Sequence, residues 1–273
     1  MATPIGNLED VSQRAANILK NVGIIACEDT RHSATLLRHV GVSGPRLVSL
    51  HEHNEGPASD RLIDELRGGV DVAVISDAGT PLVCDPGFEL VRAAWAAGLR
   101  PVPVPGPSAL LAALSVSPIA LQDFQFIGFL PAKEQSRRMR LAHFLASCAP
   151  FVFFETAPRF LATARQLQAL NAGGRAMFVA RELTKRHESL YFGAVDDIAR
   201  EVESAGGLRG EFVCVVEGES EPPDADAANI DRMLKILLNE LKPTQASRLA
   251  AKITGQPRRR VYARALELTP DGE

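Results

Sequence analysis

Three loops of small and polar residues, two of which follow apolar stretches of the sequence, are the first places where a ligand could bind. The loops span Thr3–Leu8, Ser76–Gly87 and Pro105–Ala109. In an open α/β sheet a ligand binds beyond the carboxyl ends of the strands, where Gly79 would let the backbone approach it and Asp77 could hold a hydroxyl or an amine. The second and third loops could then form two sides of one pocket. A tight turn, with Ser108 as a helix cap, is the competing interpretation of the third loop.

Charged residues cluster directly after three expected strands, where side chains line a cleft if the strands share one sheet edge. The clusters span Glu28–His32, Glu155–Arg159 and Arg181–Lys185. A surface ion pair explains any one of them, but three clusters in equivalent positions favour a functional site.

The signatures of several other chemistries are missing from the sequence. It has no G-x-G-x-x-G loop after a strand, no G-x-x-x-x-G-K-[ST] loop, no G-x-S-x-G elbow and no H-E-x-x-H helix, which argues against NAD, ATP, a hydrolase triad and a catalytic zinc. His51 and His53 lack further ligands at a convincing spacing, so no metal site is predicted. The cysteines lie far apart and mostly in apolar runs, which indicates buried, reduced thiols. They are Cys27, Cys84, Cys148 and Cys214.

The 273 residues, 46% hydrophobic and 23% charged, have an ordinary globular composition and enough length for two domains and a small appendage. No apolar run approaches the roughly 18 to 20 residues of a membrane helix, and the N-terminus lacks the features of a signal peptide, so we expect a cytoplasmic protein. The net charge of −3 argues against a protein that coats nucleic acid with its whole surface, although such an average can conceal a local basic face.

Short β-branched runs alternate with amphipathic helical stretches, which is the pattern of a parallel or mixed sheet covered by helices, so the predicted class is α/β. In a first domain, 1–117, strands are expected at Ile24–Cys27, Arg46–Leu50, Val70–Ser76 and Arg100–Val104. A second domain, 118–218, is expected to hold its own sheet. Its strands are expected at Phe124–Phe129, Phe151–Phe154, Ala176–Arg181, Leu190–Phe192 and Glu211–Glu217.

An acidic linker that contains two prolines is predicted over 219–229, and a basic helical module over 230–273. Between Lys242 and Arg264 the sequence has seven Lys or Arg residues and no Asp or Glu. Three helices, with Gly255 and Pro257 between the last two, match a helix-turn-helix-like module.

Two basic patches flank the expected cleft in the sequence and indicate an anionic polymer as a partner. One lies on an expected helix and comprises Lys133, Arg137, Arg138 and Arg140. The other is Arg258–Arg260, at the start of the last helix. A solvated helix face is the competing interpretation of both patches.

One family accounts for all these motifs in their order. The sequence resembles the tetrapyrrole-methylase-like group of S-adenosylmethionine-dependent methyltransferases, and in particular the branch that acts on small-subunit ribosomal RNA. The resemblance extends from Thr3 into the C-terminal module. The segments that carry it are TPIGNL, EDTRH, ISDAGTP, DPG, PGPSAL, GFLPAK, FFETAPR and RELTK.

The resemblance implies a fold and a reaction. The fold is two α/β domains with S-adenosylmethionine in the cleft between them, plus a helix-turn-helix-like C-terminal module in this branch. The reaction is 2′-O-methylation of a cytidine ribose in the decoding region of 16S rRNA, with free 16S rRNA or the 30S subunit as the partner and no metal. The resemblance also implies a homodimer.

Within this interpretation, individual residues receive roles. The cofactor would be lined by Asp77, Ala78, Gly79, Leu82, Ser108, Ala109 and Phe154, with the Phe212–Val216 strand as a weaker candidate for the adenine wall. The candidates to position or deprotonate the ribose hydroxyl are Asp29, Glu155, Glu182 and Lys185, and the sequence does not choose among them. The candidates to contact RNA are Thr3, Pro4, Gly6, Asn7, Arg31, Lys133, Arg137, Arg138, Arg159, Arg181, Arg258, Arg259 and Arg260.

One departure and two alternatives stay open. Members of this group carry a complete apolar strand before the TPIGN loop, whereas only Met1 and Ala2 precede it here, too few for a strand at about 3.3 Å per residue. Either the start codon was assigned too late or the sheet lacks a full first strand. The alternatives are a methylase of small corrinoid or porphyrin precursors, against which the basic helix and tail argue, and a nucleic-acid-binding regulator with a cofactor-sensing core. Turnover of S-adenosylmethionine would exclude the regulator.

Overall fold

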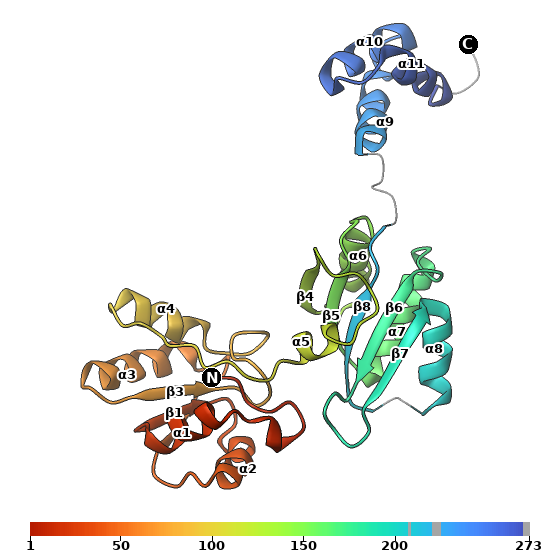
Figure 1. The fold of residues 1–273 in the computed structure, drawn as a ribbon. Helices are drawn as coiled ribbons and strands as arrows, with labels where there is room; N and C mark the ends of the chain where they lie inside the picture. The colour runs from red at the N-terminus through yellow and green to blue at the C-terminus, as the bar shows by residue number, and fades with distance from the viewer. Residues whose placement is uncertain (207–208, 220–224, 270–273) are drawn as a thin grey trace. The chain divides into compact units, whose positions relative to one another are not determined.

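The computed structural model describes residues 1–206, 209–219 and 225–269, which separate into two compact units (Figure 1). The main unit comprises residues 1–142 and 150–217, and the C-terminal unit comprises 143–149 and the chain from 218 onward. The main unit is α/β and the C-terminal unit is helical, so the predicted fold class is confirmed. The predicted domain boundaries at 117 and 218 stay predictions.

The first sheet of the main unit has three parallel strands in the order β2-β1-β3. They are β1 (Ile24–Cys27), β2 (Arg46–Ser49) and β3 (Val72–Ile75), as the sequence predicts to within two residues at each end. All four residues of β1 are buried, because helices cover both faces of the central strand.

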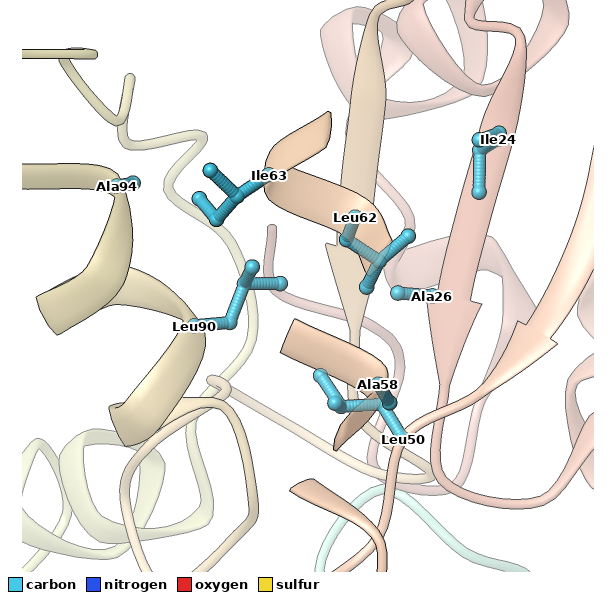
Figure 2. Close-up of a cluster of buried hydrophobic side chains, with 8 residues drawn as sticks. All are labelled: Ile24, Ala26, Leu50, Ala58, Leu62, Ile63, Leu90 and Ala94. Carbon is cyan, nitrogen blue, oxygen red and sulfur yellow. The ribbon is translucent and has the colours of Figure 1, made fainter. Parts of the chain in front are cut away.

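Alternate residues of β1 pack against different helices. Ile24 and Ala26 face α3 (Glu55–Arg67) and α4 (Phe88–Ala96), and Figure 2 shows this cluster, to which Leu62 and Leu90 also belong. On the opposite face, side chains of β1 and β3 pack against α1 (Gln13–Asn21) and α2 (Thr30–Val40). A short 3₁₀ turn, η1 (Leu8–Asp10), precedes α1.

The strand expected at Arg100–Val104 does not form, which corrects the prediction. Pro101 and Pro103 lack the N–H groups that a ladder needs at alternate positions. The first residues of the chain lie beside this extended segment, where the Ala2 N–H donates to Val104 O (3.2 Å). Thr3 forms an isolated antiparallel bridge with Gly79.

The second sheet of the main unit is mixed, with five strands in the order β4-β5-β8-β6-β7. Only β4 and β5 are parallel, and the other neighbours run antiparallel. The strands are β4 (Gln125–Phe129), β5 (Phe151–Thr156), β6 (Ala176–Arg181), β7 (Ser189–Ala194) and β8 (Glu211–Val216). All five predicted strands are therefore confirmed.

Helices cover both faces of this sheet as well. On one face, α5 (Ala109–Leu114) packs on a cluster that includes Val213. On the other face, Phe160 of α7 (Ala157–Ala169) stacks on Phe212, with ring centroids 4.8 Å apart. The remaining helices of this region are α6 (Glu134–Leu145) and α8 (Val195–Ser204).

The C-terminal unit contains the helices α9 (Ala225–Leu237), α10 (Pro243–Thr254) and α11 (Arg258–Glu267). Their core includes Leu234, Ala250 and Val261, and Gly255, at φ +69°, ends α10. The linker was expected to reach residue 229, but α9 begins at Ala225; residues 220–224 of that linker lie outside the described residues. No helix in the described ranges is both long enough and apolar enough to cross a membrane.

Two of the four cysteines differ from the expectation of buried thiols. Cys27 and Cys214 are buried, whereas Cys84 and Cys148 are exposed. Cys84 has φ +66° in an irregular loop, so its apolar neighbours in sequence do not form a buried strand there.

Candidate active site

A cavity of about 250 Å³ lies in the main unit, where loops at the ends of several strands come together. Four predicted cofactor residues line it, namely Asp77, Ala78, Ala109 and Phe154. The predicted reaction residues Glu155, Glu182 and Lys185 also line it. The sequence therefore located the loops of this cavity correctly, although the roles assigned to their residues stay predictions.

The loop after β3 is held against the start of the chain. Thr3 and Gly79 exchange backbone hydrogen bonds of 2.8 and 3.1 Å, and the Thr3 hydroxyl donates to Ser76 O (3.0 Å). Gly79 has φ +87°, a conformation that a side chain would strain. These contacts fix the backbone next to Asp77, as a binding loop requires.

The other predicted cofactor residues lie close in sequence but are not among the lining residues. Leu82 has φ +69°, uncommon for a residue with a side chain, and its side chain is exposed. Ser108 lies at the N-cap of α5 but makes no side-chain capping bond, so the capping interpretation does not explain it. Gly79 shapes the loop through its backbone.

Apolar side chains from the second sheet form one wall of the cavity. Phe154 meets Phe129 edge-to-face, with ring centroids 5.5 Å apart, and it meets Phe126 at 5.0 Å. Leu183 and Phe212 add to the lining. Such a wall suits a planar apolar ring.

Carboxyl groups gather at the carboxyl ends of β1 and β3. Asp77 accepts a hydrogen bond from the Asp29 N–H (3.2 Å). Burial raises the pKa of Asp85 to about 6, and the negative charges of Glu28 and Asp77 add to this rise. Burial raises the pKa of Glu28 too, with the charge of Asp77 as the next cause. This end of the cavity therefore favours a positively charged ligand.

The carboxylate of Asp29, a predicted candidate for the proton transfer, is bound to Arg31. It caps α2 by accepting the Arg31 N–H (2.8 Å) and pairs with the Arg31 guanidinium at 2.8 Å. These bonds hold the pKa of Asp29 far below its usual range. Asp29 is not a lining residue of the cavity, so it is a poor proton acceptor there.

Glu182 and Lys185 form an ion pair on the loop after β6. The Lys185 ammonium donates to Glu182 (2.8 Å) and to Glu211 (2.9 Å). Burial lowers the pKa of Lys185, but these two bonds outweigh burial and raise it above its ordinary value. Burial likewise raises the pKa of Glu182, while Lys185 and the Glu211 N–H outweigh that effect and lower it. Lys185 therefore stays a cation near neutral pH and cannot accept a proton.

Glu155 is fully buried and bound on both oxygens. It accepts the Thr163 hydroxyl (2.8 Å) and the Thr156 N–H (2.9 Å), and it pairs with Arg159 at 3.2 Å. Arg159 also donates to Leu130 O (2.7 Å). This arrangement connects β5, α7 and the chain after β4, and it leaves Glu155 no free oxygen for a substrate.

Two loops that carry predicted RNA contacts and reaction residues pack on each other. The Asn7 N–H donates to the Thr184 hydroxyl (3.2 Å). A Cβ on Gly6 would lie 2.4 Å from Lys185 Cγ, so only glycine fits there. Gly6 and Asn7 are exposed on this surface, where an RNA could reach them.

Three predicted RNA contacts are buried, and these predictions are corrected. Thr3 is 2% exposed, and Pro4 is buried beside it. Arg137 is 6% exposed because its guanidinium turns inward and donates to Gln166 Oε1 (3.0 Å). None of the three presents a side chain that a phosphate could touch.

The other predicted RNA contacts differ in their exposure and in their partners. Arg159 is held by Glu155, and Arg181 is half-buried and donates to Arg209 O (2.9 Å). Arg31 is exposed but paired with Asp29. The exposed remainder comprises Lys133 and Arg138 on or next to α6, and Arg258, Arg259 and Arg260 at the start of α11.

Sequence reasoning missed three charged or reactive residues of the cavity: Cys84, Asp85 and Glu211. Asp85 belongs to the DPG segment, eight positions after Asp77, and its place in the same loop was the available signal. Glu211 opens β8, and no local pattern connects it with Lys185.

The sequence matches two known families. Residues 2–199 match the family described as Tetrapyrrole (Corrin/Porphyrin) Methylases. Residues 224–269 match the RsmI C-terminal HTH domain. Together these matches cover most of the chain, including the first sheet, four of the five strands of the second sheet and the three C-terminal helices.

Comparisons with individual proteins agree with this result. The chain is 47% identical over 266 residues to Ribosomal RNA small subunit methyltransferase I of Xylella fastidiosa (strain Temecula1), covering 96% of both chains. Among solved structures, it resembles cobalt precorrin-4 methyltransferase with a TM-score of 0.58, at 14% identity over 80% of this chain and 92% of that one. It also resembles uroporphyrin-III C-methyltransferase from Thermus thermophilus, solved with S-adenosyl homocysteine, with a TM-score of 0.53, at 18% identity over 79% and 94%.

Proposed function

Because this chain belongs to the tetrapyrrole methylase family, in its branch of ribosomal RNA small subunit methyltransferases I, we propose that it methylates a cytidine of 16S rRNA on the ribose 2′-oxygen. The methyl donor is S-adenosylmethionine. The substrate is the decoding region, presented either as free 16S rRNA or in the 30S subunit. A ribosomal substrate would place the protein in the cytoplasm.

The residues of the cavity fit the donor. S-adenosylmethionine carries an adenine ring, an ammonium and a sulfonium, and when bound it supplies a methyl group that is already activated on sulfur. The apolar wall around Phe154 and Phe129 suits the ring. The carboxyl group of Asp77 suits the cationic groups.

The cavity is the observation that carries the proposal. It combines an apolar wall from the second sheet with carboxyl groups at the carboxyl ends of the parallel strands, where ligands of open α/β sheets bind. A protein that aligns the ribose oxygen with an activated methyl group there, away from water, needs little further catalysis.

The test is transfer of a radiolabelled methyl group from S-adenosylmethionine to 30S subunits and to free 16S rRNA, both purified from a strain that lacks this gene. Nucleoside analysis of the labelled RNA should give 2′-O-methylcytidine, and the comparison of the two substrates identifies the partner. Retention of S-adenosylmethionine without transfer to either RNA would contradict the proposal. Label on the base instead of the ribose would contradict its 2′-O part.

The exposed cations supply the RNA contacts in this proposal. Lys133 and Arg138 belong to the main unit, and Arg258–Arg260 belong to the C-terminal unit. The three arginines occupy the first turn of α11, where positive charge opposes the helix dipole, so a phosphate partner would relieve an unfavourable arrangement.

Salt dependence measures these contacts. Each phosphate contact to single-stranded RNA adds about 0.7 to the slope of log K against log salt, so replacing Arg258–Arg260 by Gln should reduce the slope by up to about 2. Lys20→Gln on α1 changes charge at an exposed position outside both patches and is the control. An unchanged slope in the triple variant would exclude Arg258–Arg260 from phosphate binding.

We also propose that the protein is a homodimer. β7 is an edge strand of the second sheet and exposes Leu190 and Phe192, while α4 exposes Phe88 and Trp95. Exposed large apolar side chains of this kind mark association surfaces. Light scattering on the full chain should give twice the 29.4 kDa of one chain. Phe192→Glu and Trp95→Glu then show which surface is used, and a monomeric wild type contradicts the dimer.

A further inference from the structure

We infer that the Asp85 carboxylate is the general base that takes the proton from the acceptor hydroxyl, an inference that rests on the proposed methyl transfer. Asp85 lines the cavity on the same loop as Asp77, and it was not among the four candidates that the sequence suggested. Three of those candidates have their oxygens or nitrogens engaged, and the fourth lies outside the cavity lining.

The loop holds Asp85 in place from both sides. On one side, Cys84 has φ +66°, and its Sγ lies 3.0 Å from the position of a Cβ on Gly128, so β4 packs closely on the loop. On the other side, Glu55 accepts the Gly87 N–H (2.9 Å) and the Glu89 N–H (2.7 Å), which fixes the start of α4. A base held in this way can be aimed at one atom.

The charges around Asp85 come from five parts of the fold. Glu28 follows β1, and Asp77 shares the loop of Asp85. Across the cavity lie Glu155 of β5, Glu211 of β8 and the pair Glu182–Lys185 after β6. Lys185 is the cation that lines the cavity, and it is already bound by two carboxylates.

Asp85 itself has no ion pair within the described part of the chain. Its neighbours on the sheet edge are carboxyl groups, and burial with their charges raises its pKa to about 6. A base of this pKa is largely ionised near neutral pH and accepts a proton more readily than an ordinary aspartate. A hydrogen bond with the Ser76 side chain lowers the pKa of Asp85, but burial and the neighbouring charges outweigh this bond.

The proton of the ribose 2′-hydroxyl passes to the Asp85 carboxylate while the 2′-oxygen forms a bond to the methyl carbon. The bond between that carbon and sulfur breaks, and its electron pair stays on sulfur, so the sulfonium becomes a neutral thioether. Asp85 then releases the proton to water. No oxidant, reductant or metal takes part.

Asp85→Asn is the direct test, because it keeps the shape of the side chain and removes the base. We expect kcat for methyl transfer to fall by about 10²- to 10⁴-fold, with S-adenosylhomocysteine affinity, measured by calorimetry, within about threefold of wild type. In wild type, kcat should rise with pH through about 6, and this rising limb of the plot of kcat against pH should be absent in the variant. An equal loss of cofactor affinity and kcat would overturn the inference in favour of a binding role.

Glu28→Gln is the matched control. The negative charge of Glu28 raises the pKa of Asp85, but Glu28 is not a lining residue of the cavity. Removing its charge should leave the maximal kcat unchanged and move the limb to lower pH. A limb that stays in place, or an Asp85→Asn enzyme that keeps its kcat, would overturn the inference.

A readout without substrate separates this inference from the proposed function. In ligand-free protein with ¹³C-labelled aspartate, one carboxyl should titrate near pH 6 in wild type and be absent in Asp85→Asn. If wild type transfers no methyl group to either RNA, the proposed function fails before any variant is compared, and the inference falls with it. If wild type is active but no such carboxyl titrates, only the inference fails.

Discussion

Gly6→Ala is expected to destabilise the main unit, because the loop that carries Gly6 packs directly on the loop after β6. The new Cβ would lie 2.4 Å from Lys185 Cγ, 2.8 Å from Thr184 Oγ1 and 3.1 Å from Leu183 O. Carbon atoms in contact are normally about 3.5 to 4.0 Å apart, so the overlap with Lys185 is about 1 Å. The side chain of Lys185 has to move, and its bonds to two carboxylates move with it.

The size of the effect follows from overpacking, which costs about 1 to 3 kcal/mol in well-packed sites. A unit of this length loses about 2 to 4 °C in Tm for each kcal/mol, so Gly6→Ala should unfold about 2 to 12 °C below wild type. Calorimetry on the full chain measures this difference. Gly44→Ala is the control, since a Cβ on Gly44 meets nothing within 4 Å, and it should unfold at the wild-type temperature.

A double-mutant cycle then tests the cause. Lys185→Ala removes the Cγ atom that the new methyl group meets, so Gly6→Ala should cost less in that background, by about 1 kcal/mol. Equal costs in the two backgrounds would show that Lys185 is not the obstacle. A Gly6→Ala protein as stable as wild type would refute the close packing of the two loops.

Three further outcomes are expected. Thr163→Val removes the hydrogen bond to the buried Glu155 carboxylate and should lower the free energy of unfolding by about 1.5 to 3 kcal/mol in urea titrations, whereas Thr163→Ser should not. Iodoacetamide should label the exposed Cys84 and Cys148 in the folded protein, and S-adenosylhomocysteine should protect only Cys84, which lines the cavity; equal labelling with and without ligand would place the ligand elsewhere. A hydrogen bond from the arginine partner of Asp231 lowers the pKa of that carboxyl, so its stabilisation is present above the ordinary value of 3.8 and is lost as pH falls through the lowered pKa. The difference in Tm between wild type and Asp231→Asn should therefore narrow between about pH 7 and about pH 3, and a difference independent of pH would contradict this.

The strands were predictable because their apolar residues also have the backbone N–H groups that form the hydrogen bonds of a sheet. β1 and β8 are continuous apolar runs, and such runs form strands that are buried on both faces. The segment 100–104 has valines at alternate positions, like a half-buried strand, but prolines occupy the positions between them. The hydrophobic pattern alone does not show this, because it depends on which side chains are apolar and not on which backbone N–H groups can donate a hydrogen bond.

The site was predictable as a set of loops but not as a set of contacts. The rule that ligands bind at the carboxyl ends of strands located Asp77 and Ala109 at the cavity. It could not show that Arg137, in a run of basic residues on α6, turns inward to Gln166 of α7. The side of a helix that is buried depends on the element that packs against it, and a helix with mostly charged residues gives little sign of that side.

The carboxyl group that acts as the general base is identified by the partners of each candidate and not by its position at a strand end. Glu155, Glu182 and Asp85 all line the same cavity, so position at a strand end does not distinguish them. Glu155 and Glu182 are each held by a cation, Arg159 or Lys185. For Glu182, the hydrogen bond from Lys185 outweighs burial and lowers the pKa, which weakens it as a base. Burial, followed by the negative charges of Glu28 and Asp77, destabilises the ionised form of Asp85 and strengthens it as a base. Carboxyl groups in one cavity can thus have different roles. Glu155 and Glu182, each paired with a cation, hold the loops together, whereas Asp85, which has no paired cation among the described residues, can take a proton.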